Sequence, residues 1–387
     1  MKFLLTLIAL VYIALAASTG GEQTPFTVDY KHPDFDWDLS TRRLVQMEGQ
    51  SPVWITELEK IQAKARGINF FDITDAEDLG SSLRAKSQSF KFPAPNATEK
   101  VKPILKTLST EGPRKNLEHF TSFRTRHYKS ETGRQSQLWL KRTIEETTAE
   151  WASESLQSRI TTSEFKHKWG QHSIITRING SSTTDTGIII IGAHQDSTNM
   201  WPFLPAPGAD DDGSGTVTIL ESYRALIAAD FHPERTIEFH WYSAEEGGLL
   251  GSQAVAQDYE KRGVNVFAMT HFDMTAWVKR GTREEVGIMM DNVDPSLTDF
   301  NKKIVDLYLD IPWVESKCGY ACSDHASWTK AGYPSAITGE GAFENSNNHI
   351  HSADDRIDIS DEFSFEHMLE LAKVAVAFAV ELGGVSE

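Results

Sequence analysis

The stretch TGIIIIGAHQDS, residues 186–197, is the clearest indication of fold class in this chain. It contains a run of isoleucines, Ile188 to Ile191, followed by a polar turn. A continuous β-branched run of this kind is typical of a strand buried on both faces, as in a parallel sheet that helices cover. We therefore expect a buried strand here, with His194 and Asp196 at its carboxyl end.

Strand and helix patterns alternate on both sides of this strand. Further strands are predicted at 172–180, 236–246, 264–274 and 285–292. Helices are predicted at 138–151, 214–231, 251–263, 295–311 and 361–384. This alternation favours an α/β fold, a three-layer sandwich with a mostly parallel central sheet.

The N-terminus carries the pattern of a secretory signal peptide, predicted to span residues 1–16. Lys2 precedes about fifteen apolar residues, and the small residues Ala14 and Ala16 fit a cleavage site. A membrane anchor is the alternative, which we disfavour because a span needs ~20 apolar residues and a stop-transfer flank. The protein is therefore predicted to be secreted and extracellular.

Charge and composition exclude some classes of partner. The net charge is −17, from 55 acidic and 38 basic residues, and there is no basic block. Such a chain repels the phosphates of nucleic acid, so nucleic-acid binding is not expected. No segment after the signal resembles a membrane span, and we expect a soluble monomer.

Two features of the sequence suit an oxidising, extracellular compartment. The cysteines Cys318 and Cys322, in KCGYACSDH, form a close pair that is expected to be a disulfide, with free core thiols as the alternative. A disulfide with this spacing implies a tight non-helical turn, because a regular helix orients the sulfurs poorly. Sequons at Asn96 and Asn179 are compatible with glycosylation.

Polar clusters follow the predicted strands, at the sheet edge where ligands of such folds bind. Others occur in the loop before the helix 214–231 and near the C-terminus. The candidates are His194 and Asp196, Asp210 to Asp212, Glu245 and Glu246, Asp273, and His349 and His351. Alone, each is more typical of a surface turn or a helix N-terminus. Their convergence on one edge of one sheet indicates a functional site.

Histidines and carboxylates in this number can form two metal sites of three ligands each, with one aspartate shared between them. Zinc accepts such nitrogen and oxygen ligands and keeps an open position for water, although cobalt or manganese would also bind. The spacing of Asp210 to Asp212 does not match a calcium-binding EF-hand loop. Glu245 is then the candidate general base, and Asp196 is placed to orient His194.

Six ordered motifs resemble those of the secreted fungal and bacterial leucyl aminopeptidases with co-catalytic zincs: AHQDS, APGADDDGSG, YSAEEGG, FDMT, CGYACSDHASW and IHSADD. The resemblance covers about residues 100–387, and glutamate carboxypeptidase belongs to the same superfamily. It implies the phosphorylase/hydrolase-like fold of zinc peptidases and two Zn²⁺ per subunit. The implied ligands are His194 and Asp273 for one zinc, Glu246 and His351 for the other, and Asp211 for both.

The resemblance also implies roles for other residues. Glu245 would be the general acid/base for a zinc-activated bridging water, Asp196 would orient His194, and Tyr320 would donate its hydroxyl to the oxyanion. An unusual peptide bond is implied directly after Asp211. The implied activity is release of N-terminal, preferably apolar residues such as leucine from peptides with a free N-terminus.

The side chain of the released residue would bind in an apolar pocket. Its predicted walls are Met274, Ile337, Phe343, Ile350 and the Cys318–Cys322 turn. Ordinary core packing is the alternative for Met274 and Phe343. Gly339 and Ser346 stand where some relatives carry aromatic residues, so this pocket would be roomier.

Residues 17–88 differ in character from the rest and are predicted to be a propeptide, with a retained subdomain as the alternative. They begin with a polar stretch, include one amphipathic run predicted to be helical at 51–67, and end in a polar segment. The catalytic domain is then expected at residues 89–387, and the chain would be a zymogen.

Other functions remain open from the sequence alone. A carboxypeptidase, an aminoacylase or a single-zinc glutaminyl cyclase would use the same scaffold. A cyclase keeps fewer ligands, and a carboxypeptidase needs basic groups, for which Arg356 is the candidate. A non-catalytic binding domain would have lost Glu245 or a ligand. A serine hydrolase is disfavoured because DGSGT does not match G-x-S-x-G.

Overall fold

The computed structural model describes residues 34–47, 49–81 and 91–386. The predicted signal peptide 1–16 and the predicted propeptide boundary at residues 88 and 89 lie outside these ranges. Within them, no helix has both the length and the apolar character that a membrane span requires.

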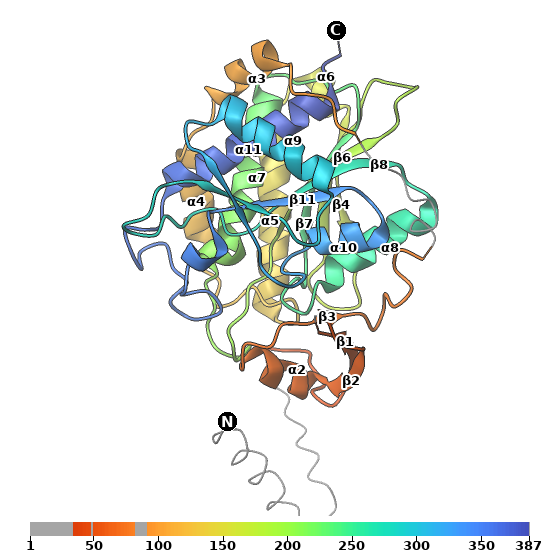
Figure 1. Cartoon of the computed structure of the whole chain (residues 1–387), viewed down its shortest axis with the longest axis vertical. Coiled ribbons are helices and arrows are strands. Elements are labelled where there is room, and N and C mark those ends of the chain that lie inside the picture. The colour runs from red at the N-terminus through yellow and green to blue at the C-terminus, as the bar shows by residue number, and fades with distance from the viewer. Residues whose placement is uncertain (1–33, 48, 82–90, 387) are drawn as a thin grey trace, which may run out of the picture. The chain divides into compact units, whose positions relative to one another are not determined.

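An eight-stranded sheet runs through the middle of the main domain (Figure 1). Its strands are β4 (Ile160–Phe165), β5 (Ser173–Ile178), β6 (Ile188–His194), β7 (Ile237–Tyr242), β8 (Val266–Phe272), β9 (Val286–Met289), β10 (Trp313–Ser316) and β11 (Ser335–Gly339). They are ordered β10-β9-β11-β8-β6-β7-β5-β4. The pairs β6–β7, β6–β8, β8–β11 and β9–β10 are parallel, and the other three are antiparallel.

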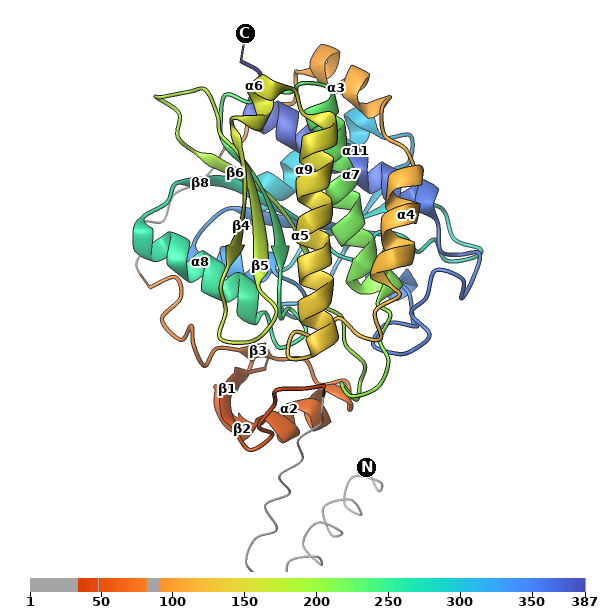
Figure 2. The ribbon, with the colours of Figure 1, turned by 180° about the vertical axis from the view of Figure 1, so that it is seen from behind.

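Helices cover both faces of this sheet, as the two opposite views in Figures 1 and 2 show. One face packs against α5 (Glu131–Trp151), α7 (Gly215–Ala228), α9 (Pro295–Tyr308) and α11 (Phe365–Gly383). The other packs against α8 (Leu250–Arg262) and α10 (His325–Ala331). The remaining helical elements are α3 (Thr98–Leu105), α4 (Glu111–Phe120), α6 (Glu154–Gln157), η2 (Ala209–Ser214) and η3 (Phe343–Asn345). The predicted three-layer α/β sandwich is confirmed.

The isoleucine strand β6 lies inside this sheet and is buried on both faces. Ile189 and Ile191 belong to the core cluster under α7 and α11, whereas Ile188 and Ile190 belong to the cluster under α8 and α10. Successive side chains of a strand point to opposite faces, so an unbroken apolar run suits a strand that both helical layers cover.

Local signals explain the ends of several helices. α9 begins at Pro295, and the side chain of Asp294 caps it by accepting a hydrogen bond from the Leu297 N–H at 2.9 Å. α8 ends at Gly263, whose φ of 64° is a left-handed conformation that glycine adopts without a steric penalty.

The N-terminal residues 34–81 form a small separate sheet and one helix. Strands β1 (Arg42–Gln46), β2 (Val53–Thr56) and β3 (Phe71–Asp72) are ordered β2-β1-β3, and α2 (Glu57–Lys64) follows β2. The predicted helix 51–67 is therefore wrong in its first part. Thr56 ends the strand and starts the helix, because its side chain and that of Glu59 form a reciprocal capping box.

In the central sheet, β4, β10 and β11 were not predicted, and neither was the helix α10. β4 and β5 form an antiparallel edge, and the short β10 and β11 add to the other side of the sheet. β4, β10 and β11 have only four to six residues, and β4 is an edge strand whose Thr161 and Ser163 are exposed, so their apolar patterns are too short to indicate a strand. The helix α10 follows the disulfide turn directly.

Candidate active site and metal centre

The candidate residues lie where three adjacent parallel strands end. β8, β6 and β7 are neighbours, with β6 in the middle. His194 is the last residue of β6, Asp273 follows β8, and Glu245 and Glu246 follow β7. Because the carboxyl ends of neighbouring parallel strands meet at one edge, the fold brings these residues together.

Two loops bring one further residue each to this edge. Asp211 comes from η2, and His351 from the loop before α11. The His194 Nε2 atom lies 3.1 Å from Asp211 Oδ1 and 3.6 Å from Asp273 Oδ1. The His351 Nε2 atom lies 2.9 Å from Asp211 Oδ2 and 3.2 Å from Glu246 Oε2. Asp211 therefore presents one carboxylate oxygen to each group.

The residues of both groups fit divalent metal ions. Their ligand atoms lie within 4.8 Å of one another in each group. His194 Nε2, Asp273 Oδ1 and Glu246 Oε1 are buried and have no hydrogen-bond partner among the described residues. Buried polar atoms without partners are rare in proteins, and imidazole and carboxylate are ligands that zinc accepts. The geometry is that of two cation sites bridged by one carboxylate.

The pKa shifts of the two histidines also indicate that the carboxylates of the site favour a bound positive charge. Burial opposes a charged imidazole, but the carboxylate of Glu246 and the contact with Asp211 raise the pKa of His351 to about 9. The carboxylate of Asp273 has the same effect on His194, whose pKa lies well above its ordinary value despite burial. The carboxylates thus attract cations strongly, and metal ions would take the place of these protons.

The three consecutive aspartates are buried, which excludes the alternative of a solvated loop. The Asp212 carboxylate accepts hydrogen bonds from the N–H groups of His194, Gly215 and Met274 at 2.9–3.1 Å. Asp210 is likewise bonded to backbone and side chains of neighbouring segments. The peptide bond after Asp211 is cis, at the position where the resemblance implied an unusual bond.

Asp355 supports the bridging residue and was not predicted. Its carboxylate oxygens accept the N–H groups of Asp210 at 3.0 Å and Asp211 at 3.1 Å. Its only sequence signal is its place four residues after His351, in IHSADD. It ties the loop of the bridging aspartate to the loop of His351.

Asp196 lies beside His194, but its contacts differ from the expected one. The atom nearest to His194 Nδ1 is the backbone oxygen of Asp196, at 3.1 Å, and its carboxylate oxygen is 3.6 Å away. The carboxylate instead accepts the N–H groups of Glu245 and Glu246 at 3.1 and 3.2 Å. Asp196 thereby connects the ends of β6 and β7.

Glu245 and Tyr320 line the cavity that the candidate metal ligands Asp211, Glu246, Asp273 and His351 also line. Burial raises the pKa of Glu245 well above its ordinary value, and the nearby carboxylates of Glu246 and Asp324 add to this shift. Burial raises the pKa of Tyr320, and the nearby carboxylates of Glu245 and Asp273 add to this shift. A carboxylate with a raised pKa binds a proton more readily than an ordinary one, so Glu245 suits proton transfer. The raised pKa of Tyr320 keeps its hydroxyl protonated, so it can donate a hydrogen bond.

The predicted pocket residues line this same cavity. Met274, Ile337, Phe343 and Ile350 all contribute to its wall, together with Gly339 and Ser346. Phe343 is 41% exposed, which argues against a purely core-packing role. Met289 at the end of β9 also lines the cavity and was missed by sequence reasoning.

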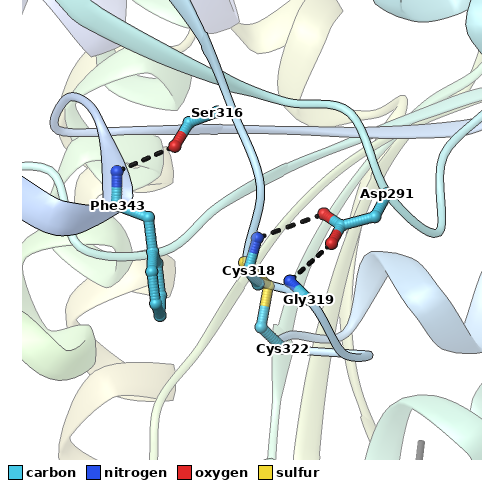
Figure 3. The surroundings of a disulfide bond; sticks show 6 residues. All are labelled: Asp291, Ser316, Cys318, Gly319, Cys322 and Phe343. Atoms are coloured by element: carbon cyan, nitrogen blue, oxygen red, sulfur yellow. Dashed lines mark hydrogen bonds between the residues drawn. A yellow bond between two sulfur atoms is a disulfide. The ribbon is translucent and has the colours of Figure 1, made fainter.

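The disulfide turn, whose surroundings are drawn in Figure 3, contributes Cys318, Tyr320, Ala321 and Cys322 to the lining of the pocket. Cys318 and Cys322 are bonded, with their Cα atoms 6.1 Å apart. The turn is non-helical, as its spacing predicted, and Gly319 has a φ of 81°. The other candidate histidine, His349, belongs to neither ligand group and packs its ring against Trp277.

The N-terminal segment also reaches this cavity. Lys64 at the end of α2 and the following residues Ile68, Asn69 and Phe70 line it. The Lys64 ammonium donates to Glu246 Oε2 and to the Glu246 backbone oxygen, the latter at 3.2 Å. A basic side chain thus contacts a predicted metal ligand.

Comparison with known proteins agrees with this geometry. The model of peptidase family M28 matches residues 173–376. The chain is similar to leucine aminopeptidase 1 of Neurospora crassa, with 49% identity over 89% of this chain and 86% of that protein. It is 45% identical to leucine aminopeptidase 1 of Coccidioides posadasii over 97% of this chain and 98% of that protein. The structure of Legionella pneumophila LapA aminopeptidase superposes with a TM-score of 0.77, at 28% identity over 89% of this chain and 99% of that one. This chain therefore belongs to peptidase family M28 and is a metallo-aminopeptidase.

Proposed function

We propose that this chain is a secreted, two-zinc aminopeptidase that releases apolar N-terminal residues, leucine among them, from peptides. The observation that carries the proposal is the bridged geometry of Asp211, with one oxygen toward His194 and Asp273 and the other toward Glu246 and His351. The enzyme would act as a monomer, without nucleic acid or membrane, and Asn96 and Asn179 are exposed and available for glycosylation.

The chain's own residues would divide the chemistry between them. Zinc ions held by the two ligand groups would polarise the scissile carbonyl and lower the pKa of the attacking water. Glu245 would take the proton from that water and pass it to the leaving amine, a role that its raised pKa supports. Tyr320 would donate its hydroxyl to the developing oxyanion.

The pocket would select the residue that is released. Its apolar wall, which includes Met274, Ile337 and Phe343, suits an aliphatic side chain. Gly339 and Ser346 leave part of the wall without bulk, so larger side chains should also enter. The amine of the substrate would lie near the carboxylates of Glu245 and Glu246, which favour a free ammonium over a blocked N-terminus.

A panel of substrates tests this proposal. The processed enzyme should hydrolyse leucine p-nitroanilide and should lose at least about 10²-fold in kcat/KM when the amine is acetylated, because a charge-paired group is removed. The phenylalanine and methionine p-nitroanilides should react within about tenfold of the leucine compound, since apolar pockets discriminate weakly. Release of C-terminal residues or cyclisation of N-terminal glutamine, without aminopeptidase activity, would instead support the carboxypeptidase or the cyclase.

We also propose that residues 17–88 are a propeptide that keeps the enzyme inactive. Although burial opposes its charge, the carboxylates of Glu246 and Glu245 raise the pKa of Lys64, which stays an ammonium. An ammonium beside Glu246 would compete with the substrate amine and repel a metal ion, and Phe70 of the same segment lines the cavity. Removal of the segment would open the site.

Proteolytic removal of residues 17–88 should therefore raise activity on leucine p-nitroanilide by at least about tenfold, since the loss of one charged contact is worth a factor of this order. In the uncleaved chain, Lys64→Met should recover part of that gain, whereas Arg66→Met, an exposed basic residue just beyond the same helix, should not. Equal activity before and after cleavage would show that the segment is not inhibitory.

A further inference from the structure

The disulfide turn carries Tyr320 but does not by itself locate it. The bond between Cys318 and Cys322 joins the two ends of the turn to each other, not to the sheet. Tyr320 lies between them and reaches the cavity that Glu245 also lines. A group that donates to an oxyanion must lie within a few tenths of an ångström of its correct place, because a 1 Å displacement can cost about 10²-fold in rate.

Asp291 links this turn to the central sheet (Figure 3). It follows β9 by two residues, and β9 pairs with both β10 and β11. Its Oδ1 atom accepts the Cys318 N–H at 3.3 Å, and its Oδ2 atom accepts the Gly319 N–H at 2.6 Å. Gly319 directly precedes Tyr320 in the chain, so the second hydrogen bond holds the residue next to Tyr320.

The form of this contact suits a positioning function. One carboxylate accepts two consecutive N–H groups, so it fixes both the place and the tilt of the turn, and a charged acceptor strengthens such bonds. Gly319 has a φ of 81° and nothing within 4 Å of where a Cβ atom would stand, so side-chain packing does not hold this point of the turn. The hydrogen bonds to Asp291 hold it instead.

A different contact, with a different consequence, lies just before the turn, at Ser316. Ser316 Oγ, at the end of β10, accepts the Phe343 N–H at 2.9 Å (Figure 3). Phe343 lies on the pocket wall, and its ring meets that of Tyr320 edge-on at 6.5 Å. Ser316 therefore supports the wall that holds the substrate side chain, whereas Asp291 supports the segment that holds Tyr320.

We propose that Asp291 is a positioning residue for catalysis, which acts by holding the Tyr320 hydroxyl where the oxyanion forms. This inference rests on the proposed role of Tyr320 in the aminopeptidase reaction. It assigns Asp291 an effect on kcat rather than on KM, because the oxyanion exists only in the transition state and not in the bound substrate.

A double-mutant cycle on the processed enzyme tests this inference. Tyr320→Phe should lower kcat on leucine p-nitroanilide by about 10²-fold, the usual cost of one oxyanion donor. Asp291→Ala should lower kcat by about tenfold or more with KM changed less than about twofold, since a displaced donor loses part of the same interaction. In the Tyr320→Phe background, Asp291→Ala should change kcat by less than about twofold. The effects of two substitutions are not additive when both residues act through the same hydroxyl.

Two further variants separate positioning from general structure. Lys317→Ala changes an exposed residue next to the turn and should leave kcat unchanged. Asp291→Asn keeps one oxygen acceptor and should fall between the wild type and Asp291→Ala in kcat. If the alanine variant does not fold, the asparagine variant replaces it in the cycle.

Each outcome of the cycle has a definite meaning. If Asp291→Ala lowered kcat by the same factor in the wild type and in Tyr320→Phe, the inference would be wrong. It would also be wrong if Asp291→Ala changed only KM. A Tyr320→Phe variant with normal kcat would instead contradict the proposed role of Tyr320. A variant of Asp291 with normal kcat beside an impaired Tyr320→Phe would reject the positioning role and leave the proposed function standing.

Discussion

Replacing Glu245 with glutamine should lower kcat on leucine p-nitroanilide by about 10²–10⁴-fold, the usual contribution of a positioned general base. Glutamine has nearly the same shape but cannot accept a proton. Glu245 belongs to neither ligand group, and Asp196 holds it through its backbone N–H, a contact that the substitution keeps. KM and the metal content should therefore stay close to those of the wild type.

The measurement is steady-state kinetics together with elemental analysis of the same preparation. Glu344→Gln is the matched control, because Glu344 is an exposed glutamate on η3, next to Phe343 of the pocket. It should behave like the wild type. If Glu245→Gln kept its kcat with metal bound, another residue would have to move the proton, and the proposed mechanism would be wrong.

Replacing Asp211 with asparagine should also lower activity strongly, through loss of the metals rather than of the proton transfer. Asp211 is the one residue that belongs to both ligand groups. An amide has a single oxygen acceptor and no charge, so it cannot bridge two cations as the carboxylate does. We expect kcat/KM to fall by at least about 10³-fold, more than the ~10–100-fold that the loss of an outer partner of a metal site costs.

Metal content provides the independent readout for this variant. The wild type should bind about two zinc ions per chain and lose activity on chelation, and zinc should restore it. Asp211→Asn should bind fewer ions, and zinc should raise its melting temperature less, because bound metal stabilises the folded state. Asp358→Asn, an exposed aspartate paired with Arg356, serves as the control. Full zinc content with full activity in Asp211→Asn would contradict the bridging role.

Much of the fold and the site could be predicted because their signals are local. The run Ile188 to Ile191 indicates a strand buried on both faces, and the observed β6 is buried in this way. His194 ends β6, Asp273 follows β8 directly, and Glu246 follows β7 after a short turn. Their convergence therefore required only that β8, β6 and β7 be parallel neighbours. Periodicity and position after a strand are properties of a few adjacent residues.

Local signals were misleading where a short segment had two possible structures. The run from Val53 to Ile61 has helical spacing, yet its first residues form β2. Pairing with β1 stabilises the strand, and Thr56 then caps the helix. The choice depends on a partner strand that lies elsewhere in the chain.

The α/β class, the main strands and helices, and the residues that gather at the sheet edge could thus all be predicted from local patterns in the chain. The three-dimensional packing determined which groups face one another. Lys64 meets Glu246 across 182 residues, Asp355 meets Asp211 across 144, and Asp291 meets Gly319 across 28. Such contacts form because many surfaces are buried together on folding, and each surface contributes only a small part of the free energy. The residues within one segment do not indicate which distant segment will pack against it.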